Sequence, residues 1–151
     1  MSPWAAISLL AILFVTPAWA ADFSGDRARV EAILALHDKL APAIDDYMAA
    51  VADDLMLMPN GGPLVEGKAA YRKHVADFYA SGTIHIRHEV LEVHSFAEVV
   101  IVRGRAVGSY TPPGGGATNT FETHNLFVFR READGKLKVW QIIFNDAPKS
   151  S

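Results

Sequence analysis

The spacing of apolar residues changes at Gly82, from a helical period before it to alternation after it. In the earlier part, apolar side chains recur every three or four residues, which is the spacing of a helix with one buried face. Gly82 suits the position just beyond a helix end, where glycine is favoured. The pattern predicts helices over residues 24–40, 43–52 and 68–81, with a short strand at 55–58 between the second and the third.

After Gly82, apolar and polar residues alternate over four long stretches, as in strands with one buried face. Pro- and Gly-rich turns at 112–116 and 134–135 are typical of hairpin connections. Helices first and strands afterwards indicate an α+β fold, in which three N-terminal helices pack on one face of a curved antiparallel sheet. The predicted strands are 83–96, 98–111, 118–131 and 137–146.

The first charged side chain is Asp22, and the residues before it form an apolar run that Pro17 interrupts. The run ends in Ala18-Trp19-Ala20, the small-residue pattern of a signal-peptide cleavage site. No lysine or arginine precedes the run, so the alternative is an uncleaved membrane anchor, which needs about 20 apolar residues. We expect residues 1–20 to be a signal peptide and 21–151 one α+β domain that is exported, periplasmic or secreted, with no membrane contact after cleavage.

Charge and cysteine content exclude several function classes. The formal net charge of −3 and the isoelectric point near 6.0 offer no basic surface of the kind that nucleic acids require. The chain contains no cysteine, which excludes disulfides, thiolate metal sites and cysteine nucleophiles. No His-x-His or Glu-x-x-His spacing is present, so we expect neither a metal centre nor a cofactor.

Three segments resemble the nuclear-transport-factor-2-like superfamily, which includes the ketosteroid isomerases and the SnoaL-like polyketide cyclases. They are ADDLMLMP at 52–59, EGKAAY at 66–71 and VWQIIFNDAP at 139–148. The resemblance covers nearly the whole mature chain. It implies a cone-shaped, cystatin-like fold that encloses a pocket, commonly in a homodimer formed through the outer face of the sheet.

The catalytic residues of ketosteroid isomerases are mostly missing. In that family a carboxylate base moves a proton, while a tyrosine and a protonated aspartic acid bind the developing oxyanion. Aligned by this resemblance, the position of the base corresponds to Met58 or Pro59 and the position of the tyrosine lies near Ala35. Met58 and Pro59 cannot accept a proton, and Ala35 cannot donate a hydrogen bond from its side chain. The third position falls at Asn125, whose amide could still donate a hydrogen bond.

Strand parity places a mostly apolar row of side chains on one face of the third long strand. A threonine and an asparagine interrupt this row, as in a ligand pocket with a few polar groups. Alternatively, both are hydrogen-bonded core residues or lie at the pocket rim. The predicted ligand-binding residues are Phe121, Thr123, Asn125 and Phe127, together with Met58, Phe78 and Asn145.

Two of the six histidines are candidates for acid–base catalysis. His88 shares a strand face with Ile84 and Ile86, which predicts an inward side chain, and His74 lies beside the apolar face of its helix. Alternatively, each is a hydrogen-bonded core residue. On the last strand, Trp140 is expected in the core with the other apolar residues of its face.

Three functions remain open. We rank first an exported binding protein that holds a small apolar or carbonyl-bearing molecule. An isomerase- or cyclase-type enzyme that uses a pocket histidine as acid and base comes second, and a structural dimerisation or assembly module third. Since one fold serves many functions, the sequence does not identify the ligand.

Overall fold

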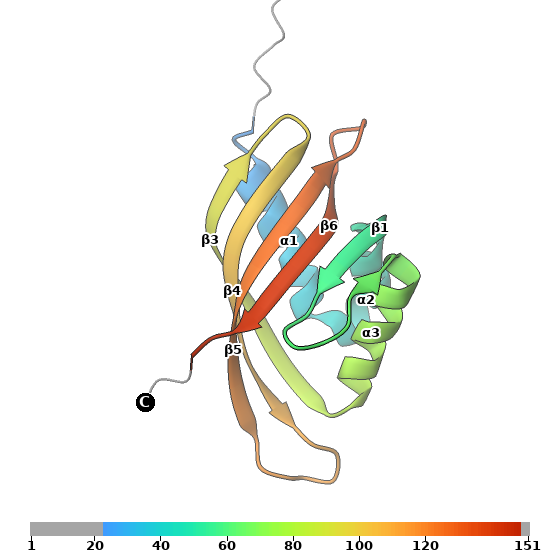
Figure 1. The fold of residues 1–151 in the computed structure, drawn as a ribbon, viewed down its shortest axis with the longest axis vertical. Coiled ribbons are helices and arrows are strands. Elements are labelled where there is room, and N and C mark those ends of the chain that lie inside the picture. Colours follow the sequence, from blue (N-terminus) through green and yellow to red (C-terminus); the bar gives the residue numbers. More distant parts are fainter. Residues whose placement is uncertain (1–22, 149–151) are drawn as a thin grey trace, which may run out of the picture.

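The computed structural model describes residues 23–148, so the predicted signal peptide lies outside the described residues (Figure 1). The order of elements confirms the predicted α+β class. None of the helices within residues 23–148 is long and apolar enough to cross a membrane. The elements are α1 (Asp26–Asp38), α2 (Leu40–Ala49), β1 (Val51–Met58), β2 (Val65–Glu66), α3 (Lys68–Ala80), β3 (Thr83–Ser95), β4 (Val99–Thr111), β5 (Asn119–Arg131) and β6 (Leu137–Asp146).

The strands form one sheet in the order β2-β1-β6-β5-β4-β3. The predicted antiparallel meander accounts for β3 to β6. β1 adds to β6 in parallel and the short β2 pairs antiparallel with β1, so the sheet is mixed. The helices lie together against one face of this bent sheet, and the β4–β5 hairpin projects beyond them (Figure 1).

The boundary between α2 and β1 differs from the sequence prediction. The helix ends at Ala49 and the strand begins at Val51, whereas the sequence pattern extended the helix to 52 and began the strand at 55. Pairing with β6 sets the earlier start, because the Val139 amide donates to the Ala50 carbonyl at 2.8 Å. Asp54 therefore lies within a strand and is exposed to solvent.

The core lies between the helices and the inner face of the sheet. Val30 and Leu34 of α1 and Tyr47 of α2 are buried in one cluster with apolar residues of β4 and β5. The hydroxyl groups of Tyr47 and Tyr71 lie 3.1 Å apart and hydrogen-bond to each other, which satisfies two polar atoms inside this core.

A β-bulge in β6 changes the side on which Trp140 lies. Phe129 pairs with Val139, while the preceding β5 residue, Val128, pairs with Gln141, so Trp140 is the extra residue. Its indole donates to the exposed Asp54 carboxylate at 3.2 Å. The prediction that Trp140 belongs to the core is therefore wrong, since the bulge interrupts the alternation.

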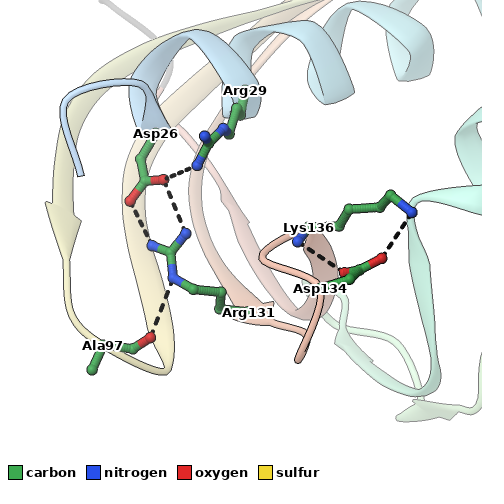
Figure 2. A network of polar contacts seen from close by, with 6 residues as sticks. All are labelled: Asp26, Arg29, Ala97, Arg131, Asp134 and Lys136. Carbon is green, nitrogen blue, oxygen red and sulfur yellow. Dashed lines mark hydrogen bonds and ion pairs between the residues drawn. The ribbon is translucent and has the colours of Figure 1, made fainter. Parts of the chain in front are cut away.

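A buried ion pair joins the start of α1 to the end of β5 (Figure 2). Asp26 has no exposed surface and accepts two hydrogen bonds from the Arg131 guanidinium, at 3.2 and 2.7 Å. Arg29 adds a third contact at 3.2 Å, and Arg131 Nε donates to the Ala97 carbonyl. Burial alone would raise the pKa of Asp26, but these partners outweigh it and hold the pKa below its usual value.

Candidate functional site

A cavity of about 260 Å³ lies between the inner face of the sheet and helices α1 and α3. Every strand except β2 contributes to its wall. On the inner face of β4, the small side chain of Ala106 lies in the wall between His88 of β3 and Thr123 of β5, its two partners in the sheet. The lining is predominantly apolar, which suits a small organic ligand.

The structure brings most of the sequence-predicted site residues to this cavity. Strand parity correctly predicted that the mostly apolar row of side chains on the third long strand, β5, lies on the inner face of the sheet. The predicted residues that line the cavity are Phe121, Thr123, Asn125 and Phe127 of β5, His88 of β3, and His74 and Phe78 of α3.

Met58 and Asn145 do not line the cavity. In β1, Leu55 and Leu57 are buried on the inner side, so the alternating Met58 faces away from the cavity that Leu57 lines. In β6, Phe144 lines the cavity and Asn145 is exposed. Both predictions are wrong for the same reason, because neighbouring residues of a strand point to opposite faces.

The centre of the site is a hydrogen-bonded pair formed by His88 and Asp38. Nδ1 of His88 lies 2.6 Å from Oδ1 of Asp38, and the backbone amide of His88 donates to Oδ2 at 3.1 Å. Both oxygens of the carboxylate therefore hold the same residue. The His88 side chain is only 5% exposed, so it has little freedom to leave this position.

This contact sets the chemistry of the His88 ring. A carboxylate only accepts hydrogen bonds, so the proton of the neutral imidazole resides on Nδ1 and the lone pair on Nε2. Within residues 23–148 no hydrogen bond engages Nε2. His88 also lines the cavity, so the arrangement is that of an oriented general base.

His37, the residue before Asp38, is the second histidine at this end of the cavity. Its ring packs edge-on against His88, with centroids 4.8 Å apart. Burial, reinforced by His88, lowers the pKa of His37 well below its usual value, so the ring is neutral. Within the described chain, its Nδ1 is buried without a hydrogen-bond partner.

His37, Asp38 and His88 offer three potential metal-ligand atoms within 4.8 Å of one another. Imidazole and carboxylate groups suit several transition metals. However, Asp38 and His88 point at each other at hydrogen-bonding distance, which is the geometry of a base and its orienting carboxylate. The expectation that the protein has no metal centre stays a prediction.

Two polar groups of β5 interact within the apolar wall. The Thr123 hydroxyl donates to Oδ1 of Asn125 at 2.8 Å, and both side chains are largely buried. This bond fixes the Asn125 amide with its oxygen engaged, which leaves its NH₂ group as a donor.

Tyr79, which also lines the cavity, carries a second unpartnered polar atom. Its hydroxyl is buried and has no hydrogen-bond partner among residues 23–148. Leaving such a group unsatisfied costs about 1–3 kcal/mol.

Sequence reasoning missed Asp38, His37 and Tyr79. Fifty residues separate Asp38 from His88, and no local pattern predicts that contact. One signal was present, because a carboxylate in the last turn of a helix is unfavourable next to the negative end of the helix dipole. An acidic residue at that position suggests a role outside its own helix.

A family model described as a SnoaL-like domain matches residues 30–140. No curated protein shows a significant match to the chain.

Solved structures share the fold at low sequence identity. A ketosteroid isomerase-like protein from Erwinia carotovora atroseptica is 21% identical, with a TM-score of 0.72 over 86% of this chain and 100% of that chain. An NTF2-like protein with a cystatin-like fold from Novosphingobium aromaticivorans is 16% identical, with a TM-score of 0.70, and 85% of this chain and 86% of that chain are covered. The LinA-type3 hexachlorocyclohexane dehydrochlorinase from Novosphingobium barchaimii is 12% identical, with a TM-score of 0.73, covering 83% and 88% of the two chains. At these identities the similarity concerns the fold.

Proposed function

Because the chain belongs to the SnoaL-like domain family, we propose that it is an enzyme that removes a proton from a small, largely apolar molecule bound in the cavity. The family match also confirms the resemblance to the nuclear-transport-factor-2-like superfamily that the sequence segments indicated. The observation that carries the proposal is the 2.6 Å contact between His88 and Asp38 at the wall of an apolar cavity.

In the proposed step, Nε2 of His88 takes a proton from a carbon atom of the substrate. The electron pair of the broken C–H bond forms a double bond, either as a leaving group departs from the next carbon or as an adjacent carbonyl becomes an enolate. Asp38 stabilises the imidazolium that forms and keeps its ring in position. One protein of similar fold is named a dehydrochlorinase, and loss of HCl from carbon needs such a base.

A binding protein without catalysis is the second candidate. The aromatic rings of Phe78, Phe121 and Phe127 form much of the wall and could hold an apolar molecule with no base involved. In that case the protein would be an exported carrier, and the Asp38–His88 pair would only join α1 to β3. The contact of His88 Nδ1 with Asp38, on a residue that lines the cavity, favours the enzyme.

The chromogenic probe 5-nitrobenzisoxazole tests for a base in an apolar pocket. A base that takes its C3 proton breaks the ring N–O bond and releases a coloured phenolate. We expect the protein to accelerate this reaction, and His88→Ala to lower the rate by about 100-fold or more. Asp38→Asn should lower the rate as well, because the amide can hold the wrong tautomer of the ring.

His85→Ala is the matched control, since His85 lies on the same strand but is exposed on the opposite face. It should leave the rate unchanged. A wild-type rate no higher than that of free imidazole, or a His88→Ala rate equal to wild type, would refute the proposed base. Native mass spectrometry of protein purified from its own host would then test the second candidate, a binding protein without catalysis, by looking for a bound small molecule.

A further inference from the structure

Four residues that line the cavity form one row across the inner face of the sheet, one on each strand from β3 to β6. His88 pairs with Ala106, Ala106 with Thr123, and Thr123 with Asp146. Three strand spacings of about 4.8 Å separate the ends of the row, so the Cα atoms of His88 and Asp146 are roughly 14 Å apart. The side chains between the two ends are short, so a ligand can lie along the row.

Asp146 lies where the cavity opens to solvent. The residue is exposed, and together with Phe121 it also lines a second, more open hollow beside the start of β5. These two residues therefore mark the mouth of the cavity. The side-chain amide of Asn60 donates to Oδ2 of Asp146 at 2.8 Å, which holds the carboxylate in place. Within residues 23–148 the other oxygen, Oδ1, has no hydrogen-bond partner, so it is available to a ligand.

The charge of the lining determines which ligand group suits the mouth. Among the described residues that line the cavity, Asp146 is the only acidic one, and none is a lysine or an arginine. An exposed carboxylate is ionised at neutral pH. His37 is neutral, because burial lowers its pKa. A carboxylate accepts hydrogen bonds and does not donate them, so its strongest partner is a cationic donor.

We propose that the cavity selects ligands that carry a protonated amine at one end of an apolar body. The ammonium group binds Oδ1 of Asp146 at the mouth, where both charges stay partly hydrated, and the apolar body lies along the row toward His88. For the proposed base, the reacting carbon is then at the end of the substrate remote from its ammonium group. That catalytic meaning rests on the proposed function, whereas the selectivity itself concerns binding.

Three probes with the same ring system separate the effect of charge from that of size: naphthalene, 2-naphthylmethanol and 2-naphthylmethylamine, which carries an ammonium group at pH 7. Equilibrium dialysis at pH 7 and low salt measures the dissociation constant of each. We expect the amine to bind about fivefold more tightly than the alcohol of the same shape, which is the upper end for an exposed ion pair. Because Asp146 is exposed, this ratio should fall toward one in about 1 M NaCl.

Asp146→Asn removes the charge and keeps the shape of the side chain. It should reduce the ratio between the amine and the alcohol to about one and leave the affinity for naphthalene unchanged. The matched control is Glu98→Gln, which makes the same change of net charge far from the mouth. The Glu98 carbonyl accepts a hydrogen bond from the amide of Arg131, at the end of β5 remote from Thr123. This control should keep the ratio of the wild type.

Each contrary result has a distinct meaning. Equal binding of the amine and the alcohol by the wild type, or no binding of the amine, would overturn the proposed selectivity. An Asp146→Asn protein that still prefers the amine would show that another group supplies the charge, and would overturn the role of Asp146. His88→Ala should retain the preference, so failure of the base in the benzisoxazole assay would leave this selectivity standing. An active base without the preference would overturn the selectivity alone.

Discussion

At the scale of single residues, the pairing of Asp26 with Arg131 is the clearest case of a buried charge held by its partners. The carboxylate is fully buried, and the guanidinium is also largely covered. A charge in such a place is tolerated only when it is paired and hydrogen-bonded. The pair joins two segments that are 105 residues apart in the sequence.

Removing the charge of Asp26 should destabilise the protein. In Asp26→Asn the buried Arg131 loses its counter-charge, which typically costs about 3–5 kcal/mol. Urea unfolding at pH 7 measures the change in the free energy of unfolding. Asp134→Asn is the control, because the Asp134–Lys136 pair in Figure 2 is exposed and should contribute at most about 1 kcal/mol. Equal effects of the two variants would contradict this assignment.

The same pair gives an expected pH dependence. Since the folded protein holds the pKa of Asp26 below its usual value, the unfolded state binds the proton more readily. The stabilisation is complete above the unfolded pKa of about 3.9 and is lost as the pH falls through the lower folded value. Asp26→Asn should therefore show a smaller loss of stability than wild type between about pH 4 and pH 2.

At the scale of elements, the close packing of β4 against its neighbours depends on Gly108. A Cβ atom at this position would lie 2.2 Å from the carbonyl oxygen of His85 and 2.5 Å from the ring of Phe121. Only a residue without a side chain lets the three strands approach as they do here. Because Phe121 lines the cavity, this close approach also shapes the site.

Gly108→Ala should therefore destabilise the protein and disturb the cavity. The added methyl group meets backbone as well as a ring, so strands must separate, at a cost of roughly 1–3 kcal/mol. Urea unfolding measures the loss of stability, and dialysis with naphthalene measures the weaker binding expected from a displaced Phe121. A variant with wild-type stability and affinity would contradict the close approach of β4.

Sequence periodicity predicted the elements better than it predicted the site. The helices follow the three-to-four-residue spacing of apolar positions and the four long strands follow alternation, and parity placed Thr123 and Asn125 of β5 correctly in the cavity wall. Parity failed in β6, because a bulge at Trp140 has no counterpart in the hydrophobic pattern. The contact of Asp38 with His88 depends on the packing of α1 on β3, which is a tertiary event without a local signature.

At the scale of the whole molecule, we propose that the mature chain forms a homodimer through the outer face of the sheet, as the resemblance to the nuclear-transport-factor-2-like superfamily implies. Leu126 on β5 is 37% exposed there, among ion pairs that link Arg103 with Glu92 and Arg105 with Glu89. Native mass spectrometry of protein from its own host should give twice the mass of a chain that begins at Ala21. Leu126→Glu should halve the assembly mass without changing the chain mass. A monomer, or a chain that retains residues 1–20, would refute the corresponding part of this prediction.

The position of β6 has a consequence for how the chain is made. This strand comes after the other five in the chain but lies inside the sheet, between β1 and β5. During synthesis β1 therefore has no partner on that side, and the edge of β5 that pairs with β6 stays open, until β6 leaves the ribosome. The sheet cannot close strand by strand in the order of synthesis. In that interval a translocase, a chaperone or a protease competes with folding for the nascent chain.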